Sequence, residues 1–332
     1  MASRRLPAFR GNDNVLLTPP SSLYFCYTGP VFEARYYERL EDKKVRCRLC
    51  PQDCLIHPGR VGICYVRYND DGRLIPLTYG RVASVHLDPI EKKPLHFFHP
   101  GSTVLSIGAI GCNLGCPWCQ NWQIAQPKEL VKRGLVPTAD PRAVVEELTG
   151  PLGVKELADL AERYSAQRNI GVAFTYNEPF IWFEYVLDAA REIRARGLKN
   201  VLVTNGFVHE EPLKELIPYI DAMNIDVKGF SEEFYRRVGG SLAPVLKTAE
   251  SAKDVCHVEI TNLLIPGLNT DREQIEALVD WIADRLGPDT PLHFSRYFPA
   301  RRLKVPSTPA ADLQTAQEIA GRRLKAVILG NV

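Results

Sequence analysis

The chain has 332 residues, of which 45% are hydrophobic, so it is long enough to bury a barrel-sized core beside a smaller module. This length excludes a single small domain. The 41 basic residues nearly balance the 39 acidic ones, so there is no general electrostatic case for binding nucleic acid or an anionic membrane.

The nine cysteines occur mainly in clustered spacings, and we identify no signal peptide. This pattern is typical of reduced thiols and metal binding in the cytoplasm rather than of a disulfide framework. No apolar run approaches the length of a membrane-spanning helix.

Three regions follow one another along the chain. Residues 1–22 are basic and then rich in proline and serine, and we expect a flexible N-terminal arm. Residues 23–100 are predicted to form a Cys-rich metal-binding module, and residues 101–332 a larger α/β domain.

The N-terminal module contains four cysteines within 18 residues, at Cys47, Cys50, Cys54 and Cys64. Four sulfurs make a closed metal site, and both a structural zinc ion and an iron-sulfur cluster accept four thiolates. The alternative is that these four cysteines bind no metal. Cys256 is expected in the core, and Cys26 has no assigned role.

The loop from Gly111 to Asn121 places Cys112, Cys116 and Cys119 in the spacing C-x3-C-x2-C. Three thiolates can hold three corners of a four-iron cluster and leave one iron free for another ligand. Buried core cysteines or half of a zinc site are the alternatives. The spacing argues against them, since paired cysteines or zinc-spaced histidines are missing from roughly the next fifty residues.

From Thr103 onward, short apolar runs alternate with helical patterns at intervals of roughly thirty residues, as in repeated β/α units. Strands are predicted at 103–109, 171–176, 200–205, 222–228, 257–264, 291–297 and 325–330, with amphipathic segments at 143–167, 180–196, 272–285 and 312–323. The pattern predicts a parallel barrel or partial barrel.

Most of the unusual polar residues follow the ends of these predicted strands. They are Thr175 to Glu178, Thr204 to Gly206, Asp226 to Lys228, Asn262 to Gly267, and His293 with Arg296. Parallel barrels place reactive groups at the C-terminal ends of their strands, so we expect one active site above the cysteine loop.

The cysteine loop, with Trp118 before its third cysteine, resembles the radical S-adenosylmethionine (SAM) signature. The wider segment 88–126 resembles the AmmeMemoRadiSam-system branch of that superfamily, which is related to pyruvate formate-lyase activating enzymes. The resemblance implies a partial parallel (β/α) barrel of the radical SAM type. It also implies a 4Fe-4S cluster on the three cysteines, with SAM as cofactor and Trp118 near it.

Glu178 follows the second predicted strand, where the family carries a glycine-rich GGE motif that holds the methionine end of SAM. A fixed carboxylate suits the ammonium group of SAM, although an acid that begins a helix is the alternative. Thr204 and Asn205 offer groups suited to a ribose or carboxylate, or form an ordinary turn.

Asp226 and Lys228 alternate on one strand and should both point into the barrel, as SAM contacts or as a structural ion pair. Asn262 precedes a turn that could pass near adenine, and Arg296 is a candidate for an anionic group. His293 would face the mouth of the barrel together with Arg296 only if the predicted strand 291–297 is interrupted there.

The sequence therefore predicts a radical SAM enzyme, an activating-enzyme-like oxidoreductase that acts on an unidentified substrate such as a protein. We expect a protein reductant such as flavodoxin or ferredoxin, and neither nucleic acid nor membrane as partner. The N-terminal site is expected to hold iron-sulfur in preference to zinc. The rival is a non-catalytic iron-sulfur electron-transfer or metal-binding assembly protein.

The chain ends shortly after its last predicted strand, at Val332. Related sequences often continue into a further cysteine-bearing tail, so we expect any function of that tail to be missing.

Overall fold

The structure is a computed structural model that describes residues 32–332. The expected arm at 1–22 and Cys26 lie outside the described residues. Within residues 32–332, no helix is long and apolar enough to cross a membrane.

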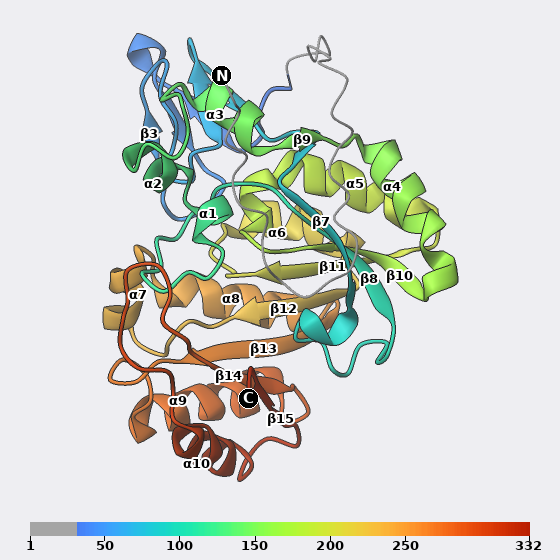
Figure 1. Ribbon diagram of the computed structural model, residues 1–332, viewed down its shortest axis with the longest axis vertical. Coiled ribbons are helices and arrows are strands. Elements are labelled where there is room, and N and C mark those ends of the chain that lie inside the picture. The colour runs from blue at the N-terminus through green and yellow to red at the C-terminus, as the bar shows by residue number, and fades with distance from the viewer. Residues whose placement is uncertain (1–31) are drawn as a thin grey trace.

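The largest sheet of the described chain has eight strands in the order β15-β14-β13-β12-β11-β10-β8-β7 (Figure 1). Its strands are β7 (Ser84–Pro89), β8 (Thr103–Gly108), β10 (Asn169–Phe174), β11 (Lys199–Thr204), β12 (Ala222–Asp226), β13 (His257–Leu264), β14 (Leu292–Arg296) and β15 (Val327–Gly330). All neighbours are parallel except β7, which pairs antiparallel with β8. Because β7 and β15 are edge strands, the barrel is open, and the predicted partial parallel barrel is confirmed.

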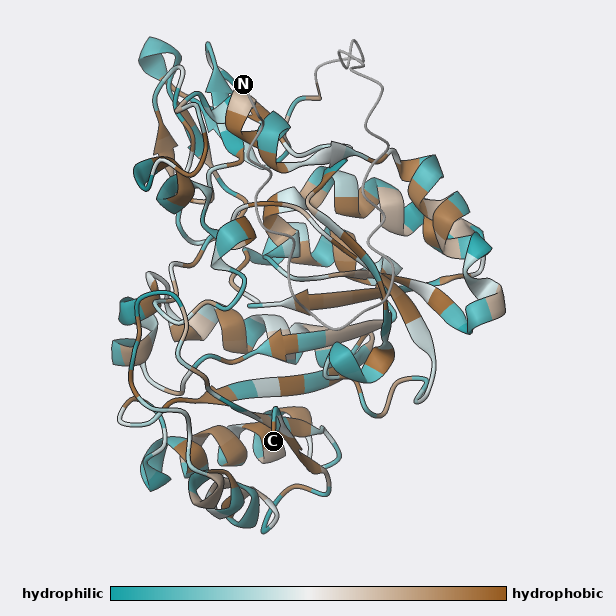
Figure 2. Cartoon of the chain, viewed as in Figure 1, coloured by the Kyte–Doolittle hydropathy of each residue, from teal (hydrophilic) through white to brown (hydrophobic). Residues whose placement is uncertain are grey.

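Several helices cover the outside of this sheet, while α1 to α3 lie beside the N-terminal strands (Figure 1). The helices of the described chain are α1 (Trp122–Ala125), α2 (Pro127–Lys132), α3 (Pro141–Leu148), α4 (Val154–Arg163), α5 (Phe183–Ala195), α6 (Glu210–Leu216), α7 (Glu232–Val238), α8 (Leu242–Lys253), α9 (Arg272–Trp281) and α10 (Ala310–Ala320). Helix α5 packs on β10 and β11, α8 on β13, and α10 on β14 and β15. The strands are strongly apolar and the helices carry polar residues between apolar ones (Figure 2).

The seven strands predicted from residue 103 onward are all present. Strands covered on both faces read as continuous apolar runs, and Val104 to Ile107 is such a run, interrupted only by Ser106. The prediction missed β7, because its half-buried edge position leaves His86 and Asp88 within the strand and no apolar run to detect.

The predicted amphipathic segment at 143–167 is wrong as a continuous helix. Helix α3 ends at Leu148, and Gly150–Pro151 forms the short strand β9 before α4 begins at Val154. The proline lacks a backbone donor and glycine is a weak helix former, so the chain breaks there.

The N-terminal module forms two small antiparallel sheets. These contain β1 (Tyr37–Arg39), β2 (Val45–Cys47) and β3 (Leu55–Ile56) in one, and β4 (Arg67–Asp70) and β5 (Arg73–Pro76) in the other, while β6 (Arg81–Val82) pairs with β9. The module boundary at residue 100 stays a prediction, although β7, on its N-terminal side, belongs to the main sheet.

A polar cluster lies at the N-terminal ends of β13 and β14, away from the cysteine loop. The buried Glu259 accepts hydrogen bonds from the backbone N–H groups of His96 and Phe97, and its two oxygens lie 2.8 and 2.6 Å from Nε2 of His257 and His293. The strand β14 runs unbroken, so His293 faces this cluster and the condition that would place it at the mouth is not met.

Acid should weaken this end of the barrel through Glu259. Burial opposes ionisation, but hydrogen bonds from His257, His293 and Phe97 outweigh it and lower the pKa of Glu259 to about 2. Its pKa in the folded protein lies below the ordinary glutamate value of 4.5, so its stabilising contribution is present above pH 4.5 and is lost as the pH falls toward 2. We expect Glu259→Gln to lower Tm at pH 7 and to reduce the further loss of Tm on acidification. Parallel Tm curves for both proteins would contradict this role.

Candidate active site

The cysteine loop leaves the C-terminal end of β8 and is fastened at both sides by residues that follow β10. The Asn177 side chain accepts from the N–H of Ala109 at 3.1 Å and donates to the carbonyl of Gly111 at 3.0 Å. On the far side, Asn121 Nδ2 donates to the carbonyl of Tyr176 at 2.8 Å. Tyr176 and Asn177, which directly precede Glu178, therefore brace the loop on which the thiols lie.

The three thiols of the loop act on one another electrostatically. Burial raises the pKa of Cys112 well above its ordinary value, and the charges of Glu178, Cys116 and Cys119 raise it further. Burial also raises the pKa of Cys116 to about 11, while the ammonium group of Lys228 lowers it. Burial thus disfavours the thiolate form of these cysteines, while the positive charge of Lys228 favours it for Cys116.

A buried arginine clamps the same loop from the other side of the barrel. Arg301 NH1 donates to the carbonyls of Gly115 and Cys116 at 3.0 and 2.6 Å. Its guanidinium also pairs with Glu129 at 2.7 Å, and both side chains are only 4–5% exposed. Arg301 is not among the site residues predicted from the sequence. The adjacent pair Arg301-Arg302 after the sixth predicted strand was the available signal.

Glu178 joins the ends of β10 and β11. Its Oε1 accepts from the N–H of Phe180 at 2.9 Å and from Thr204 Oγ1 at 2.8 Å, and its Oε2 accepts from the N–H of Asn205 at 2.8 Å. Burial raises the pKa of Glu178 to about 7, against the effect of these hydrogen bonds. The helix-start alternative therefore describes part of what Glu178 does, and SAM contact stays a prediction.

Asn205 reaches the cysteine loop directly. Its Nδ2 lies 3.7 Å from Cys112 Sγ and donates to Asn113 Oδ1 at 2.9 Å. Asn113 Nδ2 in turn donates to the carbonyl of Phe207 at 2.7 Å. These bonds tie the loop to the end of β11, so Asn205 has a positioning role whether or not it also meets a ligand.

Asp226 and Lys228 form an ion pair at 2.6 Å beside the loop. The charge of Lys228 lowers the pKa of both Cys116 and Cys119, against the larger effect of burial. The Asp226-Lys228 pair therefore lies on the side of the barrel near Cys116 and Cys119.

Three other predicted cofactor residues have protein partners in the structure. Asn262 Nδ2 donates to the carbonyl of Val227 at 2.7 Å, and Arg296 Nε donates to the carbonyl of Thr308 at 2.8 Å. Trp118 is buried, with its ring centroid 5.3 Å from that of Phe234. Their roles toward SAM stay predictions.

The N-terminal cysteine segment contacts the cysteine loop at Cys64 and Gln52. A Cβ added to Gly111 would come within 2.3 Å of the Cys64 carbonyl oxygen, and Gln52 Nε2 donates to the Asn113 carbonyl at 2.8 Å. Within residues 32–332, no three or more His, Cys, Asp and Glu side chains are grouped as the ligands of a metal ion would be. The metal assignments therefore stay predictions.

Gly111 allows this close approach, and its substitution offers a steric test. Its φ is 91°, and an alanine there would need both a strained backbone and a shift of Cys64. Gly134 is the matched control, with a φ of 64° and open space around its added Cβ. We expect Gly111→Ala to lower both Tm and iron uptake well below the values for Gly134→Ala. Equal losses in the two variants would show that the contact with Cys64 is unimportant.

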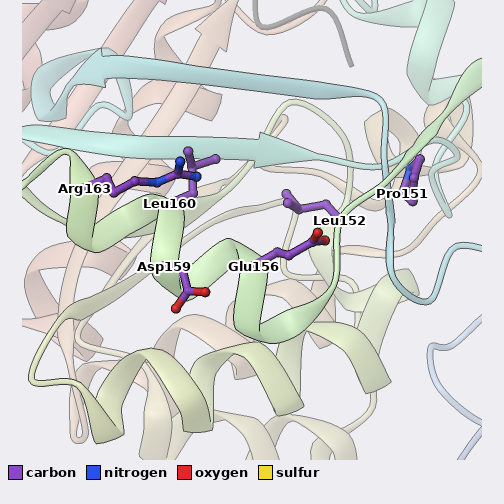
Figure 3. A pocket seen from close by; sticks show the side chains of 6 residues that line it. All are labelled: Pro151, Leu152, Glu156, Asp159, Leu160 and Arg163. Carbon is purple, nitrogen blue, oxygen red and sulfur yellow. The ribbon is translucent and has the colours of Figure 1, made fainter. Parts of the chain in front are cut away.

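One surface hollow lies away from the candidate site. It has a volume of about 470 Å³ and is lined by Pro151, Leu152, Glu156, Asp159, Leu160 and Arg163, mostly on α4 (Figure 3). None of the candidate site residues lines it, so it belongs to a different part of the surface.

A loop with three cysteines at the C-terminal edge of an open parallel barrel is typical of an iron-sulfur enzyme that keeps one iron free. The model of the Radical SAM superfamily matches residues 107–282, which is more than half of the chain. The chain belongs to the radical SAM superfamily, and it is an enzyme.

Relatives extend this result. An uncharacterized protein of Methanocaldococcus jannaschii is 40% identical over 306 residues, covering 90% of this chain and 85% of the relative. The pyruvate formate-lyase 1-activating enzyme of Escherichia coli K12 is 25% identical over 183 residues, covering 52% of this chain and 66% of that enzyme. The (2S)-3-sulfopropanediol dehydratase activating enzyme of Klebsiella oxytoca is 26% identical over 123 residues, covering 35% and 38%.

Among solved structures, Streptococcus suis SuiB bound to S-adenosylmethionine has a TM-score of 0.48 and 15% identity, covering 68% of this chain and 51% of SuiB.

Proposed function

We propose that this enzyme cleaves SAM reductively with a 4Fe-4S cluster bound by Cys112, Cys116 and Cys119. When bound, the cluster and SAM would supply methionine and a 5'-deoxyadenosyl radical that abstracts hydrogen from the substrate. The observation that carries this proposal is the geometry of the three-cysteine loop, which follows the C-terminal end of β8 and is held by Asn177, Asn205 and Arg301.

The residues present fit such a cluster. The backbone N–H of Leu114 lies 3.4 Å from Cys112 Sγ, and Asn205 offers a second donor to the same sulfur. The positive charges of Lys228 and Arg301 both favour the ionised form of Cys119. Donors and positive charge around anionic sulfur are the environment that stabilises thiolate ligands.

Other residues of the chain would orient SAM and exclude water. Glu178 has accepting capacity left on Oε2 for an ammonium group, since this oxygen has one partner in the structure. The Asp226-Lys228 pair is well placed to meet a polar ligand above the thiols. The buried brace of Asn113 and Asn205 would hold these groups in register with the loop.

We propose a partner protein as substrate, with a backbone glycine as the site of hydrogen abstraction. The names of the activating-enzyme relatives support this substrate class. A protein reductant of the flavodoxin or ferredoxin class would supply the electron, and this chemistry suits the reducing cytoplasm.

The test is product formation under anaerobic conditions. The protein is reconstituted with iron and sulfide, reduced, and mixed with SAM, and 5'-deoxyadenosine is measured by chromatography. We expect product from the natural protein and from Cys256→Ala, a cysteine outside both groups, and none from Cys116→Ala. A fully loaded, reduced protein that leaves SAM intact would instead favour the electron-transfer or assembly function.

A further inference from the structure

Backbone contacts bring together the chain segments that carry the N-terminal cysteines. The N–H of Cys47 donates to the carbonyl of Cys54 at 3.0 Å, so the backbones of these two cysteines lie side by side. A Cβ added to Gly62 would lie 3.5 Å from Cys54 Sγ, so the segment leading to Cys64 passes the same point. Cys50 lies in the turn between them, and all four thiols are free of disulfides.

A buried cation with unused hydrogen-bond donors lies beside these thiols. The Arg67 side chain is 1% exposed, and its NH1 pairs with Glu184 Oε1 at 2.8 Å. Its Nε and NH2 are buried and lack partners within the described chain. The Arg67 carbonyl accepts a hydrogen bond from the N–H of Gly62 at 2.9 Å, which places Arg67 beside the segment that leads to Cys64.

Charged donors that are buried without an acceptor lower the stability of the folded protein. We therefore expect anionic acceptors beside Nε and NH2 of Arg67. Metal-bound thiolates would supply them, and the sulfides of a cluster would add further acceptors. The orphan N–H groups of Arg67 therefore point to an anionic centre held by the four thiols.

This centre would be directly adjacent to the first cysteine loop. Asn113 is the shared residue. Its carbonyl accepts a hydrogen bond from Gln52, between Cys50 and Cys54, at 2.8 Å, and its Oδ1 accepts from Asn205 at 2.9 Å and lies 4.0 Å from Cys112 Sγ. The packing of the Cys64 carbonyl on Gly111 makes a second connection. Both connections reach a residue that flanks Cys112, namely Asn113 in the first and Gly111 in the second.

The outer edge of the four-thiol group reaches the surface. Leu55 and Ile63, which adjoin Cys54 and Cys64, are 47% and 58% exposed. Cys54 itself is less buried than the other three. The four-cysteine segment thus extends from exposed apolar residues to the loop that carries Cys112, Cys116 and Cys119.

Building on the proposed function, we propose that Cys47, Cys50, Cys54 and Cys64 bind a second 4Fe-4S cluster that passes electrons to the first. In each transfer a flavodoxin-class reductant loses one electron, and the second cluster gains it and then gives it to the first. No covalent bond and no proton changes place. Zinc would accept the same four thiolates, but it has no redox chemistry and could not serve as the relay.

Metal analysis of the full reconstituted chain tests the site. We expect about eight irons and eight sulfides in the natural protein and about four of each in Cys116→Ala, since each cubane holds four of both. The reduced Cys116→Ala protein should show a cluster signal by electron paramagnetic resonance that is unchanged by SAM. One zinc ion with about four irons, or about four irons and no other metal, in the natural protein would overturn the second cluster.

The relay has a separate readout. Formation of 5'-deoxyadenosine is compared with reduced flavodoxin and with titanium(III) citrate as electron donors. In the double variant Cys50→Ala/Cys54→Ala, we expect the flavodoxin rate to fall relative to the titanium rate. An unchanged ratio would overturn the relay. A natural protein that carries about eight irons and cleaves SAM with neither donor would refute the proposed function and leave the second cluster standing.

Discussion

Replacing Arg301 with methionine is expected to cost about 3 kcal/mol of folding free energy and most of the bound iron of the first site. The substitution leaves the buried carboxylate of Glu129 without its buried partner. It also removes the donors to the carbonyls of Gly115 and Cys116, which hold the cysteine loop in place. Urea unfolding and iron content after reconstitution measure the two losses.

Arg302 provides the matched control, because it pairs with the same Glu129 oxygen at 2.9 Å but is 60% exposed. An exposed ion pair contributes little, so Arg302→Met should cost less than about 1 kcal/mol and keep its iron. If the two substitutions cause equal losses of stability and iron, the hydrogen bonds from Arg301 to the cysteine loop are not important for either property.

Arg67→Met should be as damaging, with a loss of about 3–5 kcal/mol, because it leaves the buried Glu184 carboxylate unpaired. Glu184 Oε1 would keep only the backbone N–H of Arg35, at 2.7 Å, and Oε2 has no partner in the described chain. The midpoint of urea unfolding should fall accordingly.

The double variant Arg67→Met/Glu184→Leu separates the ion pair from the proposed cluster. Removing both charges of a buried pair is often neutral, so most of the stability should return. Iron content of the four-cysteine site should stay low, since the cation that faces Cys47 and Cys64 is still missing. A double variant as unstable as Arg67→Met would mean that the pair itself is not the main source of the loss.

The strands of the barrel could be predicted because burial on both faces demands continuous apolar runs, as in β8 and β11. Strand β7 follows no such pattern, since it is itself an edge strand and its Asp88 pairs with the buried Lys93. The break between α3 and α4 was readable in Gly150–Pro151, but amphipathic periodicity on both sides concealed it.

The cysteines of the candidate site were predictable because ligand spacing is local in sequence. The supports of that site are not local. Arg301 meets the loop across 185 residues and Asn205 meets Asn113 across 92, and no spacing rule connects such pairs. Glu178 was found by its place after β10, but its bonds to Thr204 and Asn205 appear only in the structure.

The central claim is that the loop of Cys112, Cys116 and Cys119 holds a cluster with an iron open to SAM. The most direct measurement is the electron paramagnetic resonance spectrum of the reduced, reconstituted protein with and without SAM. We predict that SAM changes the spectrum of the natural protein and leaves that of Cys116→Ala unaltered. A spectrum of the fully loaded natural protein that SAM does not change would contradict the claim.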